Sequence, residues 1–123
     1  MIRGVVSVLV TPLDKNLNVC KKDLERLIKF QIDSGIAAFW ALGSTGEDIS
    51  LGRQTKFRFA ELLAEVVDSK IPVIIGSGEN SIEDNIDFFK HCQNCGISSV
   101  SYIHRDTKQG SDRVIASIEQ LAD

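Results

Sequence analysis

The pattern of hydrophobic and polar positions divides the chain into two kinds of segment, which alternate along it. Short apolar runs, typical of buried strands, occupy residues 4–10, 37–42 and 71–75, and a more polar run occupies residues 99–103. Longer segments in which apolar side chains recur every three or four positions, as in amphipathic helices, occupy residues 21–34, 52–67, 81–94 and 112–121. The pattern therefore predicts four consecutive strand–helix units.

Glycines and a capping sequence mark the ends of these elements. Gly35 and Gly96 each follow a predicted helix, where glycine tolerates the left-handed backbone of a C-terminal cap. Ser81 begins the third helix and Asp84 lies three residues on, which resembles a capping box with Asp in place of Glu.

Alternating strands and helices predict a parallel sheet covered by helices. Two architectures fit. One is a small doubly wound sheet that is complete with four strands. The other is half of a (β/α)8 barrel, because four units in 123 residues give about 31 residues each, and eight would approach the usual ~250 residues. Periodicity alone leaves both open.

Composition narrows the class of protein. The 123 residues fit one domain, and 43% hydrophobic and 25% charged residues are ordinary for a globular protein. A net charge of -3 without a basic stripe argues against nucleic acid or an anionic membrane as the partner. No apolar run reaches the roughly 18 residues that would span a bilayer, and no secretory signal precedes Thr11-Pro12. We therefore expect a cytoplasmic protein.

Three cysteines are present: Cys20, Cys92 and Cys95. Cys92 and Cys95 form a C-x-x-C sequence beside His91, which could be a redox pair or half of a zinc site. No second pair completes a zinc site, and the motif falls where a helix ends rather than where one begins. We expect reduced structural thiols, no metal and no cofactor.

The loop at residues 43–47 carries the main chemical signal. It follows the second strand, at the end of a parallel sheet where ligands bind in both architectures. Gly43 and Gly46 let the backbone curl so that N–H groups converge, and the hydroxyls of Ser44 and Thr45 can donate to an anion. A plain tight turn would use the same residues. No lysine follows at the spacing of a phosphate-binding P-loop.

Five features in register resemble the dihydrodipicolinate synthase and N-acetylneuraminate lyase family. They cover roughly residues 1–100 and are Thr11-Pro12, Gly35, the Gly43-Ser44-Thr45-Gly46-Glu47 loop, residues 72–81 and Gly96. The resemblance implies the N-terminal half of a (β/α)8 barrel, with residues 1–123 as one partial domain of strands 1–4 and helices 1–4. It also implies a pyruvate-dependent lyase that works through a Schiff base on a lysine.

The resemblance assigns roles to the loop residues. Thr45 would hold the carboxylate of pyruvate, or of a similar 2-keto acid, by its hydroxyl and backbone N–H, with Gly43 and Gly46 shaping the loop. Ser44 would stand in a proton relay. Glu47 would brace the loop.

By the same resemblance, a second group of residues corresponds to the regulatory site of the family members that lysine inhibits. Asn80 occupies a position used there, and Asp84 could replace the usual Glu. Neighbouring positions depart from the inhibitor-sensitive pattern: Asp48, Ile49, Arg53 and Lys56. Lysine feedback is therefore not the favoured interpretation.

Two departures affect catalysis. The Schiff-base lysine of the family lies on strand six and a relay tyrosine on strand five, both beyond Asp123. The chain's own lysines fall on predicted helices or loops, and none is expected to be desolvated enough to lower its pKa: Lys15, Lys21, Lys22, Lys29, Lys56, Lys70, Lys90 and Lys108. The tyrosine stretch after strand four is replaced by residues 104–108, so Tyr102 lies within the strand. His104 is either an acid–base group or a polar residue at a strand end.

These features favour a truncated or split member of the family, most like 4-hydroxy-tetrahydrodipicolinate synthase of lysine (diaminopimelate) biosynthesis. It would carry the carboxylate loop but not the Schiff-base lysine, and would be inactive alone. Its partners would be a 2-keto acid and either a complementary C-terminal half or further copies of itself. Two alternatives remain: a non-catalytic half-barrel that self-associates, and a small anion-binding α/β domain.

Overall fold

The computed structural model describes residues 1–104 and 111–122. The strands are β1 (Val6–Val8), β2 (Ala38–Ala41), β3 (Val73–Ser77) and β4 (Ser99–Tyr102). The helices are α1 (Lys21–Asp33), α2 (Arg53–Val67), α3 (Ile82–Asn94) and α4 (Ser111–Ala122), with a short 3-10 helix, η1 (Asp48–Ser50), before α2. Every predicted element is therefore present. Among the described residues, no helix is long and apolar enough to cross a membrane.

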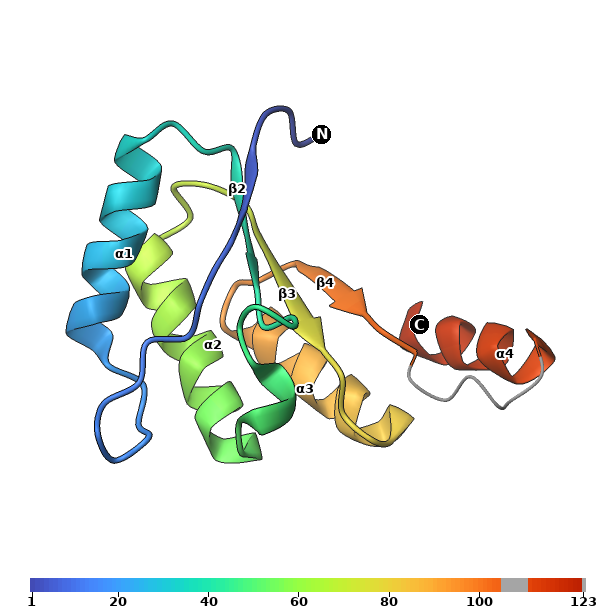
Figure 1. The fold of residues 1–123 in the computed structure, drawn as a ribbon. Coiled ribbons are helices and arrows are strands. Elements are labelled where there is room, and N and C mark those ends of the chain that lie inside the picture. Colours follow the sequence, from blue (N-terminus) through green and yellow to red (C-terminus); the bar gives the residue numbers. More distant parts are fainter. Residues whose placement is uncertain (105–110, 123) are drawn as a thin grey trace.

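The four strands are all parallel and lie in the order β1-β2-β3-β4. Successive helices contact one another, and α1, α2 and α3 lie side by side against the sheet (Figure 1). A doubly wound sheet would reverse its strand order and carry helices on both faces. That alternative is wrong, and the fold is the first half of a (β/α)8 barrel.

The hydrophobic core lies between the sheet and these helices. Phe39 of β2 and Ile75 of β3 are completely buried on the helix-facing side, because strand side chains alternate between the two faces. Leu24 of α1, Phe59 of α2 and Phe88 of α3 meet them, and each is also completely buried. One continuous core therefore holds the first three units together.

The opposite side of the sheet, termed the inner face, is open. Val8, Trp40, Ile74 and Ser99 pair across the strands and form one row on it. Val8 is 46% exposed and Trp40 is 41% exposed. The apolar runs predict buried strands, and this side is more exposed than that pattern suggests because in a closed barrel it would face further strands.

The predicted helix ends are confirmed. Gly35 and Gly96 have φ values of 83° and 94°, the left-handed backbone that ends α1 and α3. The Ser81 hydroxyl accepts a hydrogen bond from the Asp84 backbone N–H at 3.0 Å, which caps α3. The Ser81 hydroxyl in turn donates to the Asp84 carboxylate at 2.8 Å. In a capping box the carboxylate accepts from the backbone N–H of the capping residue instead, and the Asp side chain is shorter than the usual Glu.

Candidate functional site

The Gly43–Glu47 loop joins β2 to η1 at the carboxyl end of the sheet (Figure 1). Leu42 and Glu47 frame it with φ values of 50° and 58°. The Glu47 N–H donates to the Ser44 carbonyl at 3.2 Å, and the Asp48 N–H reaches back to the Gly43 carbonyl at 3.4 Å. The loop is therefore a closed turn held by its own backbone.

Two glycines permit the close packing of this turn. A Cβ at Gly46 would lie 3.0 Å from the backbone of Leu42. A Cβ at Gly76 of β3 would lie 1.9 Å from the Leu42 carbonyl oxygen. Because real Cβ atoms do not approach a backbone oxygen so closely, β3 and the loop meet at a distance that only glycine allows at position 76.

Thr11 ties the loop to the segment that follows β1. Its hydroxyl donates to the Gly46 carbonyl at 2.8 Å, across 35 residues of sequence. The Thr11-Pro12 motif was recognised in the sequence, but this role was missed because the spacing does not reveal which backbone group the hydroxyl meets.

Ser44 and Thr45 are both exposed at the tip of the loop. Within the described part of the chain, neither side chain makes a hydrogen bond, so both hydroxyls are free to bind a ligand. Glu47 is also exposed, and it braces the loop through its backbone rather than through its carboxylate. The turn thus presents two hydroxyls on a rigid frame, as a carboxylate site requires.

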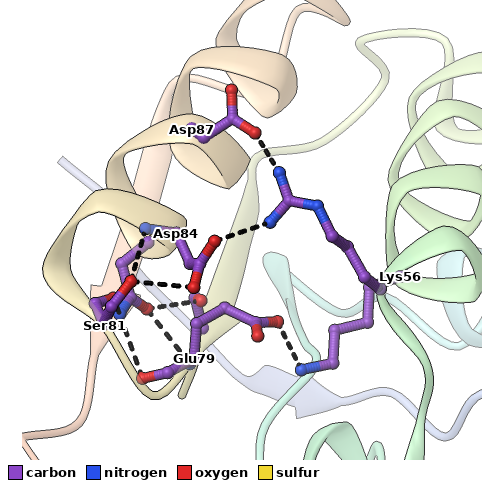
Figure 2. A network of polar contacts seen from close by, with 8 residues as sticks. Lys56, Glu79, Ser81, Asp84 and Asp87 are labelled. Carbon is purple, nitrogen blue, oxygen red and sulfur yellow. Dashed lines mark hydrogen bonds and ion pairs between the residues drawn. The ribbon is translucent and has the colours of Figure 1, made fainter.

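A polar network links the start of α2 to the loop after β3 and the start of α3 (Figure 2). The Lys56 Nζ lies 2.6 Å from the Glu79 Oε1, and the two side chains are 6% and 17% exposed. Lys56 is therefore shielded from water together with its carboxylate partner. Its partner lies 23 residues away, in the loop after β3, which helix periodicity does not reveal.

Asn85 of α3 holds the loop after β3 in place. It is completely buried, and its Oδ1 accepts from the Ser77 hydroxyl at 2.6 Å and from the Glu79 N–H at 3.2 Å. Its Nδ2 donates to the carbonyls of Glu79 and Ser81. This residue satisfies four polar groups and was not recognised in the sequence, because a single Asn on a helix has no distinctive pattern.

The two residues predicted for regulation lie on this network's outer side. Asn80 is exposed and makes no hydrogen bond within the residues described. Asp84 is also exposed, and its carboxylate lies 3.3 Å from the guanidinium of Arg53, which also pairs with Asp87 (Figure 2). Of these two residues, Asp84 is therefore already paired within the chain.

The two thiols of the C-x-x-C sequence differ in burial, because Cys92 is buried and Cys95 is half-buried. Burial raises the pKa of Cys92 to about 12 and also raises that of Cys95. Cys20, Cys92 and Cys95 are all free, and Cys95 lies 3.7 Å from the His91 Nε2. No cluster that could hold a metal occurs among the described residues. A thiol that stays protonated at neutral pH is a poor nucleophile or ligand.

Tyr102 ends β4, as expected. Its hydroxyl lies 3.2 Å from the Nδ1 of His104, two residues beyond the strand. Arg105, Asp106, Thr107 and Lys108 lie outside the described residues. An acid–base role for His104 therefore stays a prediction.

Comparison with known proteins gives matches over nearly the whole chain. The model of the dihydrodipicolinate synthetase family matches residues 1–105. The 4-hydroxy-tetrahydrodipicolinate synthases of Thermotoga neapolitana and Buchnera aphidicola subsp. Baizongia pistaciae are 36% and 32% identical over 114 residues. These alignments cover 89% of this chain but 38% and 39% of the relatives. The chain thus spans about two fifths of their length.

Solved structures agree. A prophage protein of the dihydrodipicolinic acid synthase family from E. coli K12, in complex with pyruvate, superposes with a TM-score of 0.93 and 27% identity, over 98% of this chain and 41% of that one. The chloride-inhibited dihydrodipicolinate synthase of Acinetobacter baumannii, complexed with pyruvate, superposes with a TM-score of 0.89 and 25% identity. This match covers 99% of this chain and 42% of that one. The resemblance inferred from the loop and glycine motifs is confirmed.

Proposed function

The chain belongs to the dihydrodipicolinate synthetase family, and we propose that it is a truncated or split pyruvate-dependent lyase, most like 4-hydroxy-tetrahydrodipicolinate synthase. In this proposal it supplies the site for the carboxylate of a 2-keto acid and lacks the amine that reacts with the ketone. The observation that carries the proposal is the rigid turn with the free hydroxyls of Ser44 and Thr45 at the carboxyl end of the strands.

The loop residues divide the binding chemistry. Thr45 donates its hydroxyl and backbone N–H to the carboxylate, while Gly43 and Gly46 set the path of the backbone. Ser44 lies beside it and passes a proton to or from the reacting oxygen. The pyruvate named in two structural neighbours supports a small 2-keto acid as the ligand.

The missing component is a nucleophilic lysine. Imine formation requires an unprotonated amine to attack the keto carbon, with loss of water. Lys56 is buried, but its ammonium is held by Glu79 at 2.6 Å and lies on α2 rather than at the end of a strand. Because a carboxylate contact stabilises the charged ammonium, this lysine is a poor substitute.

A complementary C-terminal half is the partner that fits the proposal best. The order β1-β2-β3-β4 leaves one bare edge on β1 and one on β4, and the inner face exposes Val8 and Trp40. Four further parallel strands would cover both edges and this face together.

The second candidate is a non-catalytic half-barrel that associates with itself. It is favoured by exposed apolar side chains at the two ends of the helical layer: Phe30 on α1 at 69%, and Ile115 and Ile118 on α4 at 53% each. Two copies related by a two-fold axis would bring α1 of one copy beside α4 of the other. Light scattering separates the readings, since a clean monomer at micromolar concentration contradicts self-association.

For Asn80 and Asp84 we propose that no regulatory amino acid binds. The Asp84 carboxylate is engaged by Arg53 and Ser81, so an incoming ammonium would compete with a guanidinium already in place. Calorimetric titration with lysine tests this. Saturable heat that is lost in Asp84→Asn would contradict it.

The decisive experiment combines pyruvate and borohydride with the purified chain. Ligand-observed NMR should detect pyruvate binding that disappears when Ser44→Ala and Thr45→Val are combined. Borohydride should trap no adduct, as read by intact mass. Absence of binding would contradict the carboxylate site, and a covalent adduct on this chain would contradict the missing amine.

A further inference from the structure

The side chain of Trp40 crosses the inner face from β2 toward β4. Its indole N–H donates to the hydroxyl of Ser101 at 3.2 Å, although β3 lies between the two strands. The residue of β3 that pairs with Ser101 is Gly76, which has no side chain. The indole therefore spans three strands through a path left open by a glycine and ends on a small polar residue.

This position places the indole against the start of the carboxylate loop. A Cβ at Gly43 would lie 4.0 Å from the Trp40 Nε1, so the loop backbone passes directly beside the ring. Ser44 and Thr45 are the next two residues. The ring is 41% exposed, so its inner-face side is open to a ligand bound beside the loop.

The ring presents an apolar surface to this ligand, and its own orientation is held by a hydrogen bond. Its only polar hydrogen is used by Ser101, so it has no donor left for a carboxylate or ketone. Turning the ring away would break that hydrogen bond. The hydrogen bond therefore favours this orientation of the indole, which presents an apolar ring on the inner face.

We propose that Trp40 is a specificity-determining residue of the keto acid site, which limits it to 2-keto acids with a short substituent. This inference rests on the proposed function. A carboxylate held by Thr45 directs the rest of the molecule past the indole, so pyruvate fits beside the ring and a 2-keto acid with an aromatic substituent collides with it.

Trp40 is the one tryptophan of the 123 residues, so its fluorescence reports on this site without labelling. Titration with pyruvate should change the emission of Trp40 in a saturable way. The combined Ser44→Ala and Thr45→Val variant should show no saturable change, and it corrects for light absorbed by pyruvate itself. If NMR detects binding while the emission stays constant, Trp40 is not beside the ligand and the inference is overturned.

Selectivity provides the second readout. Ligand-observed NMR should give tighter binding of pyruvate than of phenylpyruvate to the unaltered chain. Trp40→Ala, or Trp40→Leu if alanine unfolds the chain, should shift that ratio at least tenfold toward phenylpyruvate, about 1.4 kcal/mol. Phe30→Ala removes an exposed aromatic ring from the outer surface of α1 and should leave the ratio unchanged.

The outcomes separate the two claims. An unchanged ratio in the Trp40 variants, with both keto acids still bound, overturns the specificity role and leaves the carboxylate site intact. Failure of the unaltered chain to bind any keto acid overturns the proposed function and the inference with it.

Discussion

Lys56 of α2 and Glu79 of the loop after β3 form a buried ion pair, with 2.6 Å between Nζ and Oε1. Removing one partner leaves the other charge without compensation in a site shielded from water. We expect Glu79→Ala to lower the free energy of unfolding by about 3 kcal/mol, as for other buried pairs. Urea denaturation followed by circular dichroism measures this.

The matched control is an exposed pair of the same type. Lys29 and Asp33 lie 2.6 Å apart on α1, with side chains 76% and 62% exposed. Asp33→Ala should cost less than about 0.5 kcal/mol, because water screens both charges. Equal losses at the two sites would mean that burial does not set the strength of the Lys56–Glu79 pair.

Asn85 should be among the most sensitive polar positions. Asn85→Ala leaves the Glu79 N–H and the Ser77 hydroxyl without their acceptor, and removes the donor to two carbonyls. We expect a loss of about 3 kcal/mol in thermal or urea unfolding, since unsatisfied buried polar groups retain their desolvation cost. Asn94→Ala, at an exposed position at the end of α3, should change little. Similar losses in the two variants would mean that the four hydrogen bonds of Asn85 contribute no particular stability.

Gly76 has no room for a side chain. Gly76→Ala would place its Cβ 1.9 Å from the Leu42 carbonyl oxygen, so β3 and the loop would have to separate. We expect a loss of about 3 kcal/mol and weaker pyruvate binding. Gly52→Ala is the control, because nothing lies within 4 Å of a Cβ there. Normal stability of Gly76→Ala would show that the loop can move away without cost.

The sequence was sufficient for the order of the elements and for the position of the Gly43–Glu47 loop, which we propose as the carboxylate site. Local signals carry both: the apolar periodicity of β3 and α2, and the glycines at positions 43 and 46. The half-barrel could be distinguished from a doubly wound sheet only by family resemblance, because strand order depends on contacts between distant segments.

The sequence was not sufficient where one side chain meets a distant partner. Nothing in the sequence around Lys56 distinguishes it from an exposed helix lysine. In the structure it is buried and paired with Glu79, a residue of a distant loop. Trp40 was expected to be buried within a strand, yet it is 41% exposed because the strands that would cover it are not part of these 123 residues. In both cases the local pattern is correct and the environment comes from elsewhere in the fold.

The hydrogen bond from Thr11 to the Gly46 carbonyl should matter for binding more than for folding. Thr11→Val keeps the shape of the side chain and removes the 2.8 Å contact, so about 1 kcal/mol of stability should be lost. Pyruvate affinity should fall severalfold as the turn loosens, measured by ligand-observed NMR. Thr11→Ser retains the hydroxyl and should restore affinity. If Thr11→Val binds pyruvate normally, the turn needs no support from the Thr11 hydroxyl.

Cys92 should make stability fall at alkaline pH. Its pKa is raised to about 12 in the folded chain, from 9.0, because burial disfavours the thiolate. The unfolded chain therefore loses this proton first, and the contribution of Cys92, complete below about pH 9, is lost as pH rises toward 12. Other groups titrate in the same range, so the slope of unfolding free energy against pH must be compared with that of Cys92→Ala. A shallower slope is expected in the variant, whereas equal slopes would mean that the thiol ionises as readily folded as unfolded.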